Sequence, residues 1–335
     1  MIISTWQKVC CFITRRCQLH CRGCNVINHQ SAYELTTNEW CEAFNLIKNY
    51  GVGFIVLFGG EPTLRQDLPE LVRHLNSINM PYTIITNSVK LINSPSYLEE
   101  LLDAKPYSIS VSINIPQSKN HGTFDDELKT QYGWKLLKQI QTFYPDYKGE
   151  LVANMAITKP NIQQLPAMVK TLTKMNVWSI MSFIHLCDPH ESTYWQYRGP
   201  KNTSNENLLF NQEDKSLIHN TAQYFIDNYD TLKLHNEKEY FIVWEKYGIN
   251  QDWHCKYFTC PAINPDGSIM ACIDHPLSQP YNILTLPGRE KDMLKNFQQT
   301  IEDCPSCFWD HEWSVDFYAQ KGISNQGKLH FAHKE

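Results

Sequence analysis

Short apolar runs alternate with longer amphipathic segments along most of the chain, and the runs have the length of buried strands. Between them, apolar residues recur at helical spacing, and one such segment opens with the capping box Thr36-x-x-Glu39. The predicted strands are Val9–Thr14, Gly53–Phe58, Tyr82–Thr86, Tyr107–Ile113, Leu151–Ile157 and Trp178–Ile184. This repetition predicts an α/β fold with a parallel sheet and right-handed crossovers. Periodicity leaves a flat doubly wound sheet and a barrel open, and in both ligands bind beyond the carboxyl ends of the strands.

Two motifs follow the first two predicted strands. Cys17, Cys21 and Cys24 form a C-x3-C-x2-C triad after the first, and Gly59-Gly60-Glu61-Pro62-Thr63 follows the second. Three thiolates can hold three irons of a [4Fe–4S] cluster and leave the fourth iron open to a small molecule. The glycines allow close backbone approach to that molecule, and Glu61 can accept hydrogen bonds from an ammonium group. A structural zinc site and an ordinary strand-to-helix turn are the alternatives, although zinc usually takes a fourth ligand.

The order of triad, strand, helix, strand and Gly-Gly-Glu-Pro resembles the radical S-adenosylmethionine (SAM) family. The resemblance implies a partial (β/α)6 barrel, open on one side, with SAM chelated by the open iron. An electron from a donor such as flavodoxin or ferredoxin then cleaves SAM, and a 5′-deoxyadenosyl radical abstracts a hydrogen atom from the substrate. The implied SAM-binding residues are Gly59, Gly60, Glu61, Pro62, Asn87, Ser112, Asn114 and Asn154, with backbone of 184–186 facing adenine. Gly23 departs from the family, many of whose members have an aromatic residue there.

The C-terminal part carries four more cysteines in a recognisable spacing. Asn264–Cys272 reads as a hairpin turning at Pro265-Asp266-Gly267, and a helical segment leads on to a C-x2-C pair. The four thiolates are those of Cys260, Cys272, Cys304 and Cys307. By chemistry alone they can hold zinc or an iron–sulfur cluster. The arrangement resembles the SPASM and twitch extensions of radical SAM enzymes, which implies a second, auxiliary [4Fe–4S] cluster in a single-cluster twitch.

The remaining cysteines and several polar residues are weaker candidates. Cys10, Cys11 and Cys41 are expected to be core residues. Cys187 follows the sixth strand, where a thiol can return a hydrogen atom to a substrate radical as in radical SAM epimerases, and Cys255 is a similar candidate or a spare cluster ligand. Candidate general bases are His185, Asp188, His190, Glu191, Asp274 and His275, and Trp195, Tyr197 and Arg198 are candidates for a pocket lining or for domain packing.

Charge and composition limit the kinds of partner and compartment that the sequence indicates. Net charge is −5 with no block of like charge, so neither a nucleic acid nor a membrane surface is indicated. No signal peptide or membrane-spanning run is present, and twelve cysteines in such a chain suit a reducing compartment, so we predict a cytoplasmic protein. The predicted organisation is a radical SAM barrel over 1–205, a bridging helical segment over 206–250 and a twitch-like auxiliary domain over 251–335.

The chemistry after hydrogen abstraction separates the functional hypotheses. If the auxiliary cluster accepts an electron, a small-molecule or peptide substrate is oxidised, which is the expected outcome. If Cys187 returns a hydrogen atom the product is an epimer, and carbon–carbon cleavage is also open. Only sixteen residues precede Cys17, too few for a leader-binding domain, which favours a small metabolite or a peptide recognised through a partner. The alternative of another class is a non-enzymatic iron–sulfur or zinc protein for electron transfer or structure.

Overall fold

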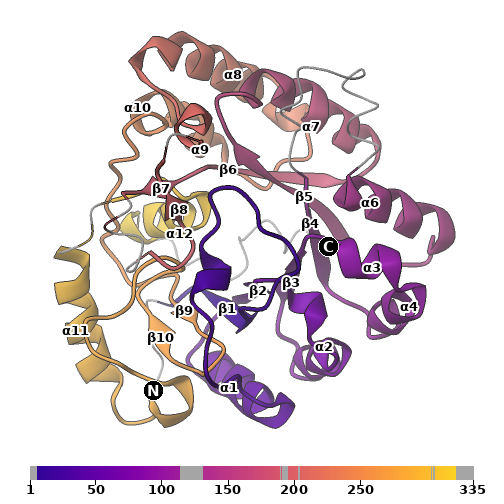
Figure 1. Cartoon of the computed structure of the whole chain (residues 1–335), viewed down its shortest axis with the longest axis vertical. Helices are drawn as coiled ribbons and strands as arrows, with labels where there is room; N and C mark the ends of the chain where they lie inside the picture. The colour runs from indigo at the N-terminus through magenta and orange to yellow at the C-terminus, as the bar shows by residue number, and fades with distance from the viewer. Residues whose placement is uncertain are drawn as a thin grey trace.

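The main sheet contains all six predicted strands and two more. The computed structural model describes residues 6–113, 131–188, 190, 195–202, 204–302, 304 and 306–321. Strands β1 to β6 pair in parallel in chain order, and the sheet continues beyond β1 in the order β10-β9-β1-β2-β3-β4-β5-β6 (Figure 1). The strands are β1 (Lys8–Thr14), β2 (Phe54–Gly59), β3 (Tyr82–Thr86), β4 (Ser108–Ser112), β5 (Glu150–Ile157), β6 (Trp178–Phe183), β9 (Ala262–Ile263) and β10 (Ile269–Met270). A small ladder of β7 (Leu186–Cys187) and β8 (Gly199–Pro200) stands apart.

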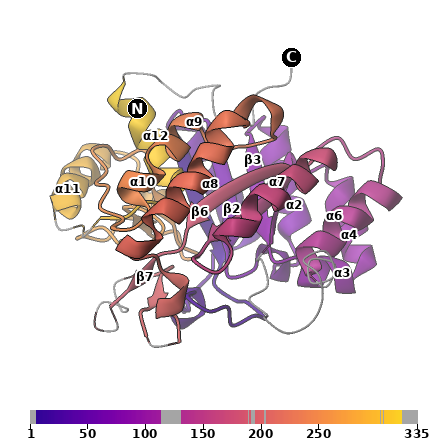
Figure 2. The ribbon, with the colours of Figure 1, turned by 90° about the horizontal axis from the view of Figure 1, so that it is seen from above.

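The helices follow the strands and pack outside the sheet (Figures 1 and 2). Those of the strand–helix repeats are α1 (Thr37–Asn49), α2 (Leu68–Ser77), α3 (Val89–Asn93), α4 (Pro95–Asp103), α6 (Tyr132–Phe143) and α7 (Leu165–Lys174). The later ones are α8 (Lys215–Asp227), α9 (Lys238–Ile242), α10 (Trp244–Tyr247), α11 (Glu290–Glu302) and α12 (Asp310–Gln320). None of the helices in the described ranges combines the length and apolar character that a bilayer crossing needs.

Strand β1 separates two apolar cores. Cys10 and Phe12 belong to an inner cluster that also contains Phe58, whereas Cys11 and Ile13 belong to the larger cluster between sheet and helices. Successive side chains of a strand point to opposite faces, which produces this division. The prediction that at least one of the two adjacent cysteines is a core residue is confirmed, because both are buried and each lies in a different core.

The predicted hairpin is present and extends the main sheet. β9 and β10 pair antiparallel, and the turn closes with hydrogen bonds from Gly267 N to Asn264 O at 2.9 Å and from Asn264 N to Ser268 O at 2.8 Å. Gly267 has φ of 83°, a conformation that favours glycine. β9 pairs in parallel with β1. Segments far apart in sequence therefore share one sheet.

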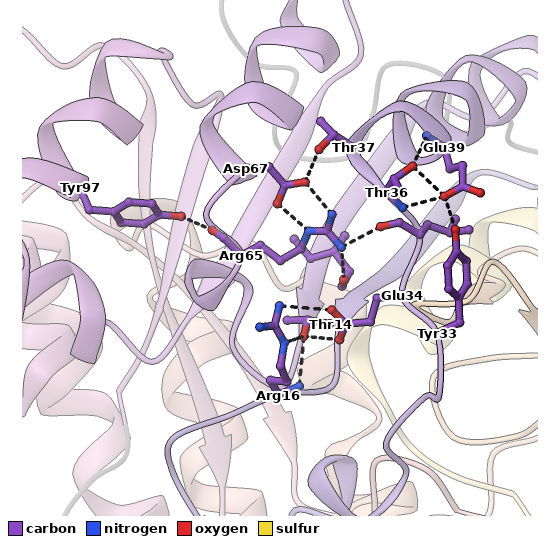
Figure 3. Close-up of polar contacts among 12 residues, drawn as sticks. Thr14, Arg16, Tyr33, Glu34, Thr36, Thr37, Glu39, Arg65, Asp67 and Tyr97 are labelled. Carbon is purple, nitrogen blue, oxygen red and sulfur yellow. Dashed lines mark hydrogen bonds and ion pairs between the residues drawn. The ribbon is translucent and has the colours of Figure 1, made fainter.

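Capping agrees with the sequence at α1 and differs at α2 (Figure 3). Thr36 and Glu39 form the predicted capping box. Asp67 occupies the N-cap position of α2, where an aspartate commonly caps a helix, but its side chain caps no helix N–H. Its carboxylate instead accepts from Arg65 Nη2 and Thr37 Oγ1, both at 2.6 Å. The arginine two residues earlier outcompetes the backbone because a charged donor forms the stronger hydrogen bond.

The side chain of Arg65 stabilises the end of β1 through hydrogen bonds (Figure 3). Arg65 Nη1 donates to the carbonyl oxygens of Ile13 and Leu35, each at 3.1 Å, and Tyr97 Oη donates to Arg65 O at 2.6 Å. Thr14 Oγ1 donates to Glu34 Oε1 at 2.6 Å. The last residues of β1, immediately before the cysteine loop, are therefore held on several sides.

The turn after β2 has no room for a side chain at Gly60. A Cβ at Gly60 would lie 2.2 Å from Arg16 O, whereas one at Gly53 would meet only Gln7 O at 3.6 Å. We expect Gly60→Ala to lower the free energy of unfolding by about 1–3 kcal/mol through backbone displacement. Gly53→Ala should change it by less than about 1 kcal/mol. Denaturant unfolding of both variants measures the difference, and equal stability of the two would contradict the close approach.

Candidate functional site

The carboxyl ends of β1 and β2 join the two sequence motifs. Gly60 N donates to Thr14 O and Glu61 N donates to Arg16 O, both at 2.8 Å. A Cβ at Gly59, whose φ is 143°, would lie 2.0 Å from Thr14 O, so only glycine permits this contact. The Gly-Gly-Glu-Pro turn is thus bonded to the backbone that leads directly into Cys17. The structure brings together the triad and the turn, as the sequence predicts.

The three thiols of the triad share one environment. Burial raises the pKa of Cys17 and Cys21, and it raises that of Cys24 to about 11. Negative charge on Cys21 further raises the pKa of both Cys17 and Cys24, which places the thiols within each other's field. Cys17 Sγ accepts from Leu19 N at 3.4 Å, a bond suited to a thiolate. Three adjacent thiols on one loop fit a three-cysteine cluster site, and binding would release their protons.

The described residues contain no group of three or more His, Cys, Asp or Glu side chains arranged to hold a single metal ion. A lone zinc ion draws thiolates to about 2.3 Å. Three features of the triad fit a cluster. All three donors are thiols, one loop carries them, and the backbone of that loop is bonded to the Gly-Gly-Glu-Pro turn.

Glu61 is a buried acceptor at the centre of the turn. Its side chain is 1% exposed, and its Oε1 accepts from Thr63 Oγ1 at 2.6 Å and Thr86 Oγ1 at 2.7 Å. Its Oε2 accepts from Asn87 N at 2.7 Å. Burial raises the pKa of this carboxyl, and these hydrogen bonds act against the rise. Glu61 therefore ties the turn to the end of β3, and Oε2 retains lone-pair capacity for one more donor.

Asn87 connects the end of β3 to the cysteine loop. Its Oδ1 accepts from Gln18 Nε2 at 3.1 Å and from Val89 N at 3.0 Å. Its Nδ2 donates to Cys17 Sγ at 3.7 Å. The predicted SAM contact is thus placed beside the first cysteine of the triad, where it also orients the loop.

The other predicted SAM contacts lie further along the same edge. Ser112 and Asn154 are directly paired residues at the carboxyl-terminal part of β4 and β5. Asn114 lies outside the described residues. In the 184–186 segment, the Ile184 carbonyl oxygen already accepts from Gln251 Nε2 at 2.9 Å. These contacts to SAM stay predictions.

The structure gives a physical reason for Gly23. A Cβ there would lie 3.0 Å from Leu186 Cδ2 and 3.1 Å from Ile184 Cδ1, and its φ is +76°. From the other side Gly199 packs on it, since a Cβ on Gly199 would lie 2.6 Å from Gly23 C. An aromatic side chain has no space at this position because the segment around β7 and β8 covers the loop.

A cavity of about 490 Å³ opens beside the cysteine loop. Its walls include Cys17 and His20 from the cysteine loop and Leu64 from just beyond the Gly-Gly-Glu-Pro turn. The volume lies within the range of small-molecule sites. A larger cavity of about 780 Å³ lies at the amino ends of β4 and β5, lined by Tyr107 and Glu150 among others, away from all the candidate chemistry. The smaller one is the relevant one because it adjoins the triad.

The C-terminal cysteines divide into a group of three and a single one. Cys272, Cys304 and Cys307 all interact electrostatically with Arg198. Cys260 is buried in the inner core, with its Sγ 3.8 Å from Cys10 Sγ. Their ligation of an auxiliary cluster stays a prediction, and the position of Cys10 beside Cys260 was not anticipated.

The weaker cysteine candidates are also located. Cys187 is 3% exposed, and its thiol lies 3.5 Å from Gly199 O on the neighbouring β8 strand. Cys255 follows Trp253 by two residues, and Trp253 exchanges backbone hydrogen bonds with Cys307 at 3.1 and 3.0 Å. Cys255 therefore lies on a segment paired with the C-x2-C motif. Both roles stay predictions.

Of the candidate bases, two are buried. His185 is 1% exposed, its ring centroid lies 4.4 Å from that of Trp309, and burial lowers its pKa well below the usual value, so the ring is neutral. Asp274 is 1% exposed and paired with Arg198. Asp188 and His190 are exposed, and His275 has a ring nitrogen 2.8 Å from Pro276 O. Glu191 lies outside the described residues.

Arg15 is a site residue that the sequence did not reveal. It is 1% exposed, its guanidinium lies 4.3 Å from the Phe12 ring centroid, and it donates to Gln196 and Asn264. Burial lowers its pKa to about 10, and its Nη1 has no hydrogen-bond partner within the described residues. The adjacent Arg16 has an exposed side chain. No periodic pattern distinguishes the two, because both follow the end of the strand.

Comparison with known proteins finds a family match in the N-terminal part. Residues 11–144 match the Radical SAM superfamily. Two PqqA peptide cyclases are similar: that of Bradyrhizobium diazoefficiens is 30% identical over 160 residues, and that of Rhodopseudomonas palustris is 35% identical over 161 residues. Each match covers 47% of this chain and 41% of the relative. The matches thus span less than half the length of the curated relatives.

Solved structures agree on the fold. SuiB of Streptococcus suis bound to S-adenosylmethionine superposes with a TM-score of 0.58 at 18% identity, covering 88% of this chain and 66% of SuiB. SuiB bound to its precursor peptide SuiA also gives 0.58, at 17% identity over 85% of this chain and 64% of SuiB. The α/β fold expected from the sequence is confirmed, and residues 11–144 match the family that the sequence resembles.

Replacement of Glu61 tests the turn. In Glu61→Gln an amide N–H₂ has to face either Asn87 N–H or the Thr63 donors, so a buried donor loses its acceptor. We expect a loss of about 1–3 kcal/mol in the free energy of unfolding and weaker SAM binding by the cluster-loaded protein. Thermal denaturation and calorimetric titration with SAM measure these effects. Glu70→Gln, on the exposed face of α2, is the control, and equal behaviour of the two variants would exclude this role for Glu61.

Proposed function

We propose that this chain uses SAM to oxidise a peptide substrate, because residues 11–144 match the Radical SAM superfamily. The observation that carries the proposal is the hydrogen-bonded junction of the cysteine loop and the Gly-Gly-Glu-Pro turn beside a cavity. Cys17, Cys21 and Cys24 would hold the cluster that binds SAM. A zinc or electron-transfer protein needs no such turn, which makes the enzyme the better explanation.

When bound, SAM and its cluster supply a 5′-deoxyadenosyl radical that takes a hydrogen atom from the substrate, whose oxidation is complete once an electron and a proton follow. The residues of this chain prepare the site for that chemistry. Asn87 fixes Cys17 and the loop that carries it. Glu61 offers its remaining lone pair to the ammonium group of SAM. His185 is buried and neutral, and the burial that lowers its pKa opposes protonation of its ring.

We propose a second, auxiliary [4Fe–4S] cluster on Cys260, Cys272, Cys304 and Cys307 as acceptor of the electron. Its support is the thiol spacing and the convergence of three of these cysteines on Arg198. Cys260 lies in the inner core, with its Sγ beside that of Cys10. A radical SAM protein that needs only hydrogen abstraction has no use for four further thiols in this spacing.

The proposed substrate is a peptide, and its support is the similarity to PqqA peptide cyclases. The precursor peptide SuiA bound by SuiB is in keeping with this, although that likeness shows the fold alone. A flavodoxin or ferredoxin is the proposed electron donor, since one electron has to enter from outside in each turnover.

Anaerobic reconstitution tests the two sites separately. With iron and sulfide the wild type should bind about eight irons per chain, as two four-iron clusters require, and should form 5′-deoxyadenosine from SAM with dithionite. Cys17→Ala/Cys21→Ala/Cys24→Ala should abolish deoxyadenosine formation. Cys304→Ala/Cys307→Ala should lower iron by about half, because only the auxiliary cluster is lost.

Cys41→Ala on α1 is the matched cysteine control, and it should keep both the iron content and deoxyadenosine formation. Retention of zinc at the C-terminal site with about four irons per chain would remove the auxiliary cluster from the proposal. Absence of deoxyadenosine from the fully loaded wild type would contradict the radical SAM function itself.

A further inference from the structure

One segment after β6 is bonded to the backbone of the cysteine triad. Asn25 N donates to Tyr197 O at 3.1 Å, and Gly199 N donates to Gly23 O at 2.8 Å. Between these bonds Cys24 and Arg198 form an antiparallel bridge. The backbone of Arg198 therefore lies directly alongside the third cysteine of the triad.

The side chain of Arg198 forms a buried ion pair with Asp274. Arg198 Nε lies 3.0 Å from Asp274 Oδ2, and the two side chains are 9% and 1% exposed. The other donors to Asp274 are Tyr197 N and Arg198 N, both at 3.0 Å to Oδ1, and Trp309 Nε1 at 2.8 Å to Oδ2. With all these donors the carboxylate is well satisfied, and it fixes the position of the guanidinium.

The terminal nitrogen Nη2 of the guanidinium lies beside the C-terminal C-x2-C pair. Arg198 Nη2 donates to Ser306 O at 3.1 Å, inside the turn between Cys304 and Cys307. Asp274 N donates at 3.4 Å to the Sγ atom of Cys272, which precedes Asp274 by two residues. Arg198 is therefore a buried cation, paired with Asp274 and bonded between Cys304 and Cys307, in the neighbourhood of three of the four proposed auxiliary ligands.

We propose that Arg198, held by Asp274, is a positioning residue that joins the two cysteine sites and raises the reduction potential of the auxiliary cluster. This inference rests on the proposed function, since it requires that cluster. A buried ion pair is weak ground for stability alone, because desolvation offsets its Coulombic gain. Because the ion pair lies between two groups of cysteines, we ascribe to it an effect on the auxiliary cluster rather than on stability.

A buried cation beside a cluster raises the reduction potential of that cluster. A thiolate-bound cluster is anionic and gains further negative charge on reduction, so a nearby buried cation stabilises its reduced form. An acceptor of the substrate's electron needs such stabilisation. The hydrogen bond to Ser306 O also holds the C-x2-C turn, in which Ser306 has φ of 94°, a strained conformation for a residue with a side chain.

The test is a redox titration of the reconstituted full-length chain, with each cluster followed by electron paramagnetic resonance. In Arg198→Met we expect the auxiliary midpoint potential to shift to more negative values than in the wild type. Arg198→Lys keeps the charge and loses the fork geometry, so its shift should be smaller in the same direction. Trp309→Phe, which removes one donor to Asp274, supplies a second, milder variant should Arg198→Met fail to bind the cluster.

Arg65→Lys is the matched control, since Arg65 is a buried arginine paired with Asp67 and bonded to carbonyl groups away from the C-terminal cysteines. Its auxiliary potential should equal that of the wild type. Two clusters with unchanged auxiliary potential in Arg198→Lys and Arg198→Met would overturn the role of Arg198 and leave the proposed function standing. A wild type with about four irons per chain would overturn the auxiliary cluster and this inference with it.

Discussion

The site depends on the hydrogen bonds between the end of β1 and the turn after β2. Gly60 N and Glu61 N bind the carbonyl groups of Thr14 and Arg16, and only residues without a Cβ allow the two backbones to approach so closely. The register of a parallel sheet brings the two strand ends side by side. The glycines then convert that proximity into a direct bond, so that the thiol loop and the turn keep one mutual orientation.

Buried charges gather near the carboxyl end of β1 and the turn after β2. Arg15, Glu61, Arg198 and Asp274 are each less than a tenth exposed, and all lie close to cysteines or to the turn. Isolated buried charges are costly, and here most are compensated by specific donors or acceptors. A polar interior of this kind is expected where charged cofactors bind, because the protein dipoles have to be in place before the ligand arrives.

The sequence was informative wherever the determinants are local. All six strands, the capping box at α1 and the hairpin turn at Gly267 depend on residues within a few positions of one another, and the structure confirms them. The Arg198–Asp274 pair spans 76 residues, and no spacing rule links its members. The burial of Arg15 beside exposed Arg16 and the approach of Cys260 to Cys10 likewise depend on tertiary packing that periodicity does not encode.

The pairing of β9 with β1 covers what would otherwise be an edge of the main sheet. Without the hairpin, β1 would become an edge strand, and the backbone N–H and C=O groups that now pair with β9 would be exposed. Such an edge is a template for pairing with other chains. The hairpin therefore covers an edge at which β1 could otherwise pair with a strand of another chain.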